Sequence, residues 1–133
     1  MNSSLTPSPR VVATDSARRL IADIRRDHPS ILFHQSGGCC DGSSPMCYAQ
    51  DDFKVGSNDI LLGEIDGVPV YIGAAQFEVW RHTQLILDVV PGRGGMFSLD
   101  NGREQRFHVR SRVFNDEEIA ALKDIALTRG VGQ

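Results

Sequence analysis

Two short apolar runs between Asp59 and Ile72, separated by the dipeptide Asp66-Gly67, constrain the fold more than any other feature of the chain. Asp-Gly between alternating apolar residues is typical of a two-residue β-hairpin turn. Most of the other predicted strands are also joined by short turns. The sequence therefore predicts an α+β fold and not a doubly wound parallel sheet. Pro69 indicates either an edge strand or the start of a strand.

Amphipathic helices flank the predicted strands. The first follows Thr14 or Asp15, either of which can cap it, and ends before Pro29. Its apolar residues have helical spacing and are Ala17, Leu20, Ile21 and Ile24. A short helix is predicted around Ala74–Arg81, where apolar residues are three apart.

A last helix begins at Asn115, with Glu118 placed three residues on as in a capping box. Its apolar face is formed by Ile119, Leu122 and Ala126, and Gly130 is expected to end it. Residues 1–12 are rich in Ser, Thr and Pro and are predicted to be a flexible N-terminal arm. Residues 13–133 are predicted to form a single α+β domain.

Further strands are predicted by apolar runs that end at turn-forming residues. They are Ile31–Gln35, a region around Tyr48–Val55, Gln84–Val90, and a second hairpin pairing Met96–Leu99 with Arg106–Val113. In the last of these, Phe107, Val109, Ser111 and Val113 are expected on one side of the strand. The expected core consists of Leu20, Ile24, Phe33, Leu62, Ile72, Phe77, Leu85, Leu87, Phe107 and Leu122.

Composition excludes several classes of protein. The net charge of −3 argues against a nucleic-acid binder, because such proteins usually carry a basic face. No apolar run approaches the roughly 20 residues that span a bilayer, so no membrane partner is expected. The polar start of the chain is unlike a secretory signal, which predicts a cytoplasmic protein with reduced thiols. The sequence leaves open whether the chain forms a homo-oligomer.

The segment that follows Ile31–Gln35 contains three cysteines within nine residues and is the candidate site. Thiolates bind zinc, iron and iron–sulfur clusters. The candidate ligands are Cys39, Cys40, Cys47 and His34, and the residues expected to shape the loop are Gly37, Gly38, Gly42 and Pro45. The alternative is that the cysteines are small buried apolar residues. A histidine in a strand likewise often hydrogen-bonds to a neighbouring group and binds no metal. No catalytic residues are identified.

The string from His34 to Cys47, with Gly73–Trp80 and Val89–Gly94, resembles a bacterial family of unknown function, DUF779. Its genes often lie beside aldehyde dehydrogenase genes, so the resemblance implies such an enzyme as partner. The order of elements also resembles that of HesB-like, A-type iron–sulfur carriers, which implies a compact mixed sheet or pseudo-barrel with flanking helices. Gly38-Cys39 matches their early ligand, whereas their Cys-Gly-Cys pair has no counterpart after Cys47.

Three functions follow as hypotheses. The first is a non-enzymatic accessory protein that carries iron, zinc or an iron–sulfur cluster and assists an aldehyde dehydrogenase. The second is a metal-free interaction module that stabilises or regulates the same enzyme. The third, a thiol enzyme or redox sensor, requires a cationic neighbour that lowers a cysteine pKa, and the sequence identifies none.

Overall fold

The computed structural model describes residues 9–35, 45–52, 54–92, 98–99, 103–123 and 128–129. Within them the chain forms two mixed sheets and three α-helices, which confirms the predicted α+β class. Sheet A has the order β1-β6-β7, with bounds Val11–Ala13, Thr83–Pro91 and Gln105–Val113. Sheet B has the order β3-β2-β5-β4-β8, with bounds Met46–Ala49, Ile31–Gln35, Val68–Gly73, Asp59–Ile65 and Thr128–Arg129. The helices are α1 (Asp15–Asp27), α2 (Ala74–Trp80) and α3 (Asp116–Lys123), and Gln50–Asp52 form a 3-10 turn.

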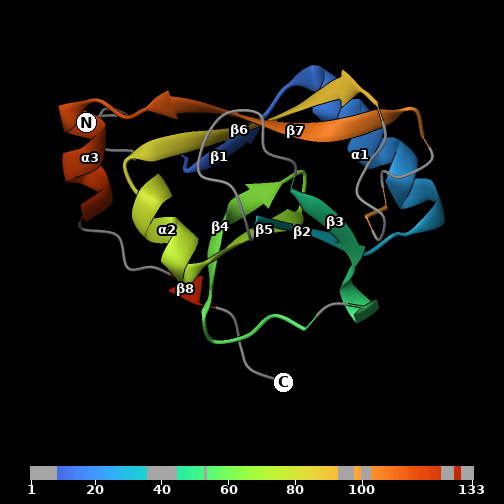
Figure 1. Ribbon diagram of the computed structural model, residues 1–133, viewed down its shortest axis with the longest axis horizontal. Helices are drawn as coiled ribbons and strands as arrows, with labels where there is room; N and C mark the ends of the chain where they lie inside the picture. The colour runs from blue at the N-terminus through green and yellow to red at the C-terminus, as the bar shows by residue number, and fades with distance from the viewer. Residues whose placement is uncertain are drawn as a thin grey trace.

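The two sheets face each other, with α1 at one end of the layers and α2 and α3 at the other (Figure 1). The core lies between the sheets, where Phe33 of β2 and Phe107 of β7 make an edge-to-face contact with ring centroids 4.8 Å apart. No strand belongs to both sheets in the part of the chain that the structure describes. The fold is therefore compact and flanked by helices as predicted, but its strands form two sheets and no closed barrel.

Helix α1 forms because its N-terminus is capped and one of its faces is apolar. The Thr14 hydroxyl accepts a hydrogen bond from the Ala17 amide at 3.2 Å, as expected of an N-cap residue. The four apolar residues with helical spacing are all buried. The helix ends at Asp27, two residues before Pro29, as predicted.

The β4–β5 hairpin is confirmed, and its turn explains the Asp-Gly dipeptide. Asp66 and Gly67 have φ values of 51° and 84°, and positive φ at both central residues is the mark of a type I′ turn. Pro69 lies at the start of β5, as one of the two alternatives predicted, but β5 is not an edge strand. Strand β2 pairs with β5 only from Val70 onward, so the missing N–H of Pro69 interrupts no pairing on that side.

Several predicted boundaries are wrong. Val11 and Val12, assigned to the arm, belong to β1, which pairs in parallel with β6. The strand expected around Tyr48–Val55 begins earlier, at Met46, and gives way to the 3-10 turn at Gln50. Residues 1–8 lie outside the described residues.

The second predicted hairpin pairs differently from the expectation. Strand β7 pairs antiparallel with β6 along its whole length. Ser98 and Leu99 are not in a strand. The Leu99 amide donates to the Cys47 carbonyl of β3 at 2.8 Å. Met96, Phe97 and the turn at residues 100–102 lie outside the described residues.

The capping box of α3 is confirmed by reciprocal hydrogen bonds. The Asn115 amide donates to the Glu118 carboxylate at 2.9 Å, and the Glu118 amide donates to the Asn115 side-chain oxygen at 2.8 Å. Leu122 is buried, whereas Ala126 and Gly130 lie outside the described residues. Of the ten residues predicted for the core, nine are buried and Leu62 is partly buried. Val113, expected on the apolar side of β7, is 73% exposed.

Candidate functional site

The cysteine segment connects two neighbouring strands of sheet B. Strand β2 ends at Gln35 and β3 begins at Met46, and the two strands are antiparallel. Five of the eight predicted site residues lie outside the described residues: Gly37, Gly38, Cys39, Cys40 and Gly42. Pro45 is buried directly before β3. The structure therefore describes the two strand ends from which the segment leaves and to which it returns.

Cys47 lies in the apolar core. It pairs with Phe33 across β2 and β3, and residues directly opposite in a sheet share one face. Both are 0% exposed, and Phe33 contacts Phe107 of the other sheet. The Cys47 amide donates to the Ser98 hydroxyl at 2.8 Å, which ties β3 to the connection between β6 and β7. This environment suits a small apolar side chain.

His34 occupies the opposite face of sheet B, because side chains alternate along a strand. Its Nε2 lies 2.7 Å from Asp59 Oδ1, and the other oxygen, Asp59 Oδ2, accepts a hydrogen bond from the Gly56 amide at 2.9 Å. The pair joins β2 to β4 across β5, which separates them in the sheet. His34 is 7% exposed, so the carboxylate holds a buried imidazole in one orientation.

The electrostatics of Asp59 reflect opposing effects. Burial alone raises the pKa of this carboxyl. The hydrogen bonds from His34 and from the Gly56 amide, together with electrostatic attraction from His34, lower it more, so the pKa lies below its ordinary value. Asp59 thus remains an acceptor, the state in which it can fix the tautomer of His34.

The structure does not bring Cys47 and His34 together, because they face opposite sides of the same sheet. Within the residues that are described, no three His, Cys, Asp or Glu side chains form a group able to hold a metal ion. Asp59 was missed by sequence reasoning, which identified it only as the start of a strand. The one available signal was a charged residue that opens an otherwise apolar strand.

Residues 20–113 match the family model described as "Domain of unknown function (DUF779)". The chain belongs to this family. No curated protein and no solved structure gives a match. The link to aldehyde dehydrogenases and the likeness to HesB-like carriers therefore stay predictions.

The span that matches DUF779 runs from within α1 to the end of β7. It includes all eight predicted site residues and also Asp59. Strand β1, the Thr14 cap and α3 lie outside it. The DUF779 match therefore covers the core of both sheets and the cysteine segment between β2 and β3.

A second polar group of this DUF779 chain lies on sheet A, around Asp88 of β6. One of its oxygens accepts hydrogen bonds from the Thr14 hydroxyl and the Val89 amide, and the other accepts from Arg110 Nε at 2.7 Å. The Arg110 bond is the main reason that the pKa of Asp88 lies below its ordinary value, since burial acts in the opposite sense. These hydrogen bonds connect the N-cap of α1 with β6 and β7.

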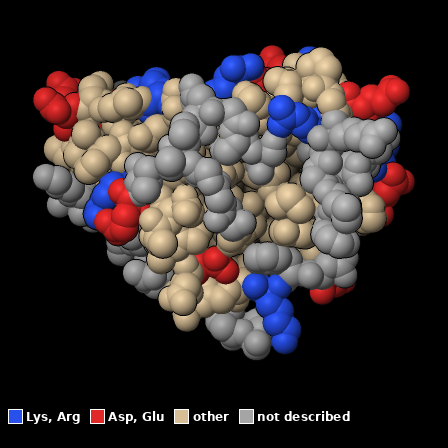
Figure 2. All heavy atoms as spheres, in the orientation of Figure 1, with Lys and Arg blue, Asp and Glu red and all other residues tan. Residues whose placement is uncertain are grey.

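Figure 2 shows acidic and basic side chains at the margin and within the visible face, with uncharged residues between them. Among the described helices, none has the length and apolar character needed to cross a bilayer. The face shows no broad region of one sign.

Proposed function

We propose that this DUF779 chain is a non-enzymatic cytoplasmic accessory protein that binds iron, zinc or an iron–sulfur cluster and assists an aldehyde dehydrogenase. The proposed ligands are His34, Cys39 and Cys40. The observation that carries the proposal is the 2.7 Å contact between His34 Nε2 and Asp59 Oδ1. It lies at the end of β2, and Cys39 and Cys40 follow His34 by five and six residues.

A carboxylate that holds one imidazole nitrogen is the usual outer partner of a metal-binding histidine, because it fixes the ring and makes the other nitrogen more basic. Asp59 is itself held by the Gly56 amide, so the orientation of the ring is determined through two successive hydrogen bonds. Thiolates and an imidazole select zinc, iron and iron–sulfur clusters over hard cations.

Cys47 has a different role in this proposal. Its side chain faces the core with Phe33, so we assign it to packing between the sheets and omit it from the proposed ligands. This divides the three cysteines between two functions. Cys39 and Cys40 supply thiolates, and Cys47 fills apolar volume.

The test is metal analysis of protein purified without oxygen and reconstituted with iron or zinc. The wild type is expected to bind metal, and Cys39→Ser and His34→Ala to lose it. Asp59→Asn should weaken metal affinity about 10- to 100-fold, the usual cost of removing an outer partner. Glu64→Gln is the matched control, because it removes an exposed carboxylate from the same strand, β4. Wild-type protein that stays metal-free after reconstitution would contradict the proposal.

The partner is tested separately, by pull-down and activity assay of an aldehyde dehydrogenase encoded by the same organism. A Cys39/Cys40→Ser double variant is expected to bind the enzyme and to lose part of its effect on activity. If the double variant retains the full effect, the alternative of a metal-free interaction module is correct. If the double variant loses the effect but metal is absent from the wild type, a thiol enzyme or redox sensor is correct. Wild-type protein that does not bind the enzyme would exclude this partner.

A further inference from the structure

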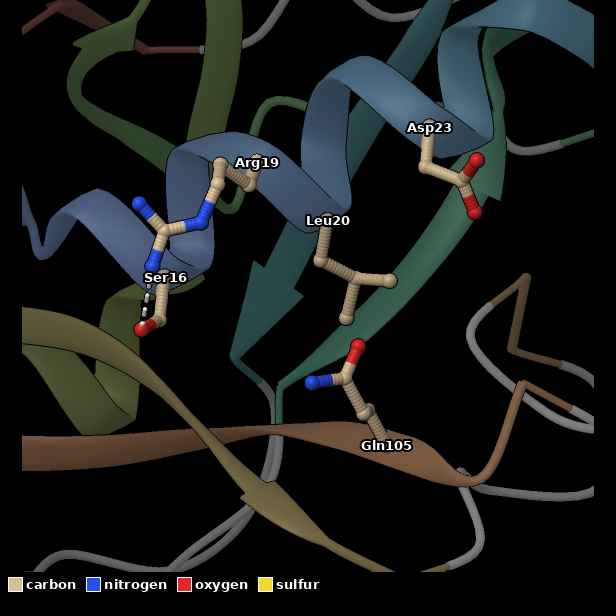
Figure 3. A pocket seen from close by; sticks show the side chains of 5 residues that line it. All are labelled: Ser16, Arg19, Leu20, Asp23 and Gln105. Atoms are coloured by element: carbon tan, nitrogen blue, oxygen red, sulfur yellow. Dashed lines mark hydrogen bonds between the residues drawn. The ribbon is translucent and has the colours of Figure 1, made fainter.

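A small hollow lies between α1 and the start of β7 (Figure 3). Its volume is about 170 Å³, and among the described residues its lining consists of Ser16, Arg19, Leu20, Asp23 and Gln105. Four of the five come from one side of α1, where positions three and four apart lie next to each other. In Figure 3 the amide of Gln105 points up toward Leu20, with Arg19 and Asp23 on either side. The hollow therefore has an apolar wall between two charged groups.

The two charged groups differ in how they are neutralised. Asp23 accepts from Arg26 at 3.2 Å and from Arg103 at 2.8 Å, so both of its oxygens are paired with guanidinium groups. Arg19 donates to the Ser16 hydroxyl at 3.2 Å and makes no ion pair with a carboxylate among the described residues. The hollow thus presents one uncompensated positive charge, on the side formed by the first turns of α1.

We infer that this hollow binds a small carboxylic acid. The carboxylate accepts hydrogen bonds from the Arg19 guanidinium and the Ser16 hydroxyl, the carbon chain lies against Leu20, and Gln105 closes the opposite side. A planar guanidinium matches a carboxylate with two parallel N–H donors. The positive end of the α1 dipole favours an anion at the same place.

The volume limits the ligand. A water molecule occupies about 30 Å³ in the liquid, so the hollow has room for roughly six non-hydrogen atoms. A four-carbon monocarboxylate such as butyrate meets this limit. A ligand of this size that binds through one charged contact is expected to have a dissociation constant on the order of millimolar. This site is separate from His34, which lies in β2 of the other sheet.

The experiment is titration of ¹⁵N-labelled protein with butyrate at constant ionic strength, followed by amide and side-chain NMR shifts. Saturable shifts are expected at Leu20 and at the Gln105 side-chain amide. Butyramide and butylamine, which have nearly the same shape without the negative charge, should give neither. Arg19→Gln should weaken butyrate binding at least about 10-fold, because it removes a hydrogen bond to a charged group. Arg18→Gln is the matched control, since Arg18 is exposed on the same helix and does not line the hollow.

The inference is wrong if butyramide binds as well as butyrate, or if butylamine binds in its place. It is also wrong if Arg19→Gln and Arg18→Gln weaken binding equally, because the shifts would then reflect general ionic attraction to α1. Both substituted residues are exposed, so the two variants should retain the helical circular-dichroism signal of the wild type.

Discussion

At the scale of single residues, alternation along β2 and β3 separates two side chains that sequence spacing had grouped together. Cys47 of β3 lies opposite Phe33 of β2, and His34 is the next residue along β2. Because side chains alternate along a strand, Cys47 faces the core and His34 faces Asp59 on the other side. Spacing along the chain therefore grouped two side chains that lie on opposite faces of sheet B. The strand period of two decides which side chains can meet.

Cys47→Ser is expected to lower the free energy of unfolding by about 1–3 kcal/mol, because it puts a hydroxyl into an apolar site that is 0% exposed. Metal content should stay at the wild-type level. The measurement is urea denaturation followed by the fluorescence of Trp80, the single tryptophan, together with metal analysis. Unchanged stability with lost metal would reverse the roles given to Cys47 and Cys39.

Asp88 should make folding stability depend on pH in the acidic range. Its pKa in the folded protein lies below the ordinary value, mainly because Arg110 donates to it, so the unfolded chain binds the proton more tightly. Its contribution is therefore present at neutral pH and is lost as the pH falls through the folded pKa. Asp88→Asn should flatten this part of the stability profile, measured by thermal melts between about pH 3 and pH 7. An equal slope in wild type and variant would show that the carboxylate contributes nothing.

At the scale of elements, local sequence patterns predicted most helices and turns. They did not predict which strands pair when those strands lie far apart in the sequence. The cap of α1, the Asp66-Gly67 turn and the Asn115–Glu118 box are each encoded within four residues, and all three are confirmed. The parallel pairings β1–β6 and β2–β5 join segments far apart in sequence, and no local pattern specifies them. The Asp59 contact with His34 depends on the second of these pairings, which explains why it was missed.

The β4–β5 turn offers a test of backbone strain. Gly67→Ala is expected to destabilise the protein by about 1–2 kcal/mol, because a φ of 84° suits glycine and penalises an L side chain. A new Cβ there would meet nothing within 4 Å, so the loss would come from conformation and not from a clash. Gly56→Ala is the control, since its Cβ would meet only Asp59 Oδ2, at an ordinary 3.8 Å. Equal denaturation midpoints for the two variants would contradict the turn assignment.

At the scale of the whole molecule, an aromatic contact joins the two sheets within the shared core. Phe33 and Phe107 come from different sheets, and their rings meet at 85°. Phe107→Leu should reduce the free energy of unfolding by about 1–3 kcal/mol, through the lost edge-to-face contact and the change of shape. Phe114→Leu is the comparison, because Phe114 is buried outside the main core cluster and should cost less. Equal losses in urea denaturation would mean that the contact between the sheets has no special importance.

The parallel pairing of β1 with β6 has a consequence during synthesis. Val11 pairs with Leu85, so the first strand emerges from the ribosome roughly 70 residues before its partner. At about 5–20 residues per second, this strand waits some 4–15 s before sheet A can begin to form. Four of the five described strands of sheet B can pair sooner, because β2 to β5 are complete once Gly73 has been made, and only β8 follows later. The half of the protein that carries His34 and the cysteines is thus the first part of this chain able to fold, and the strand at its beginning is among the last to be fixed.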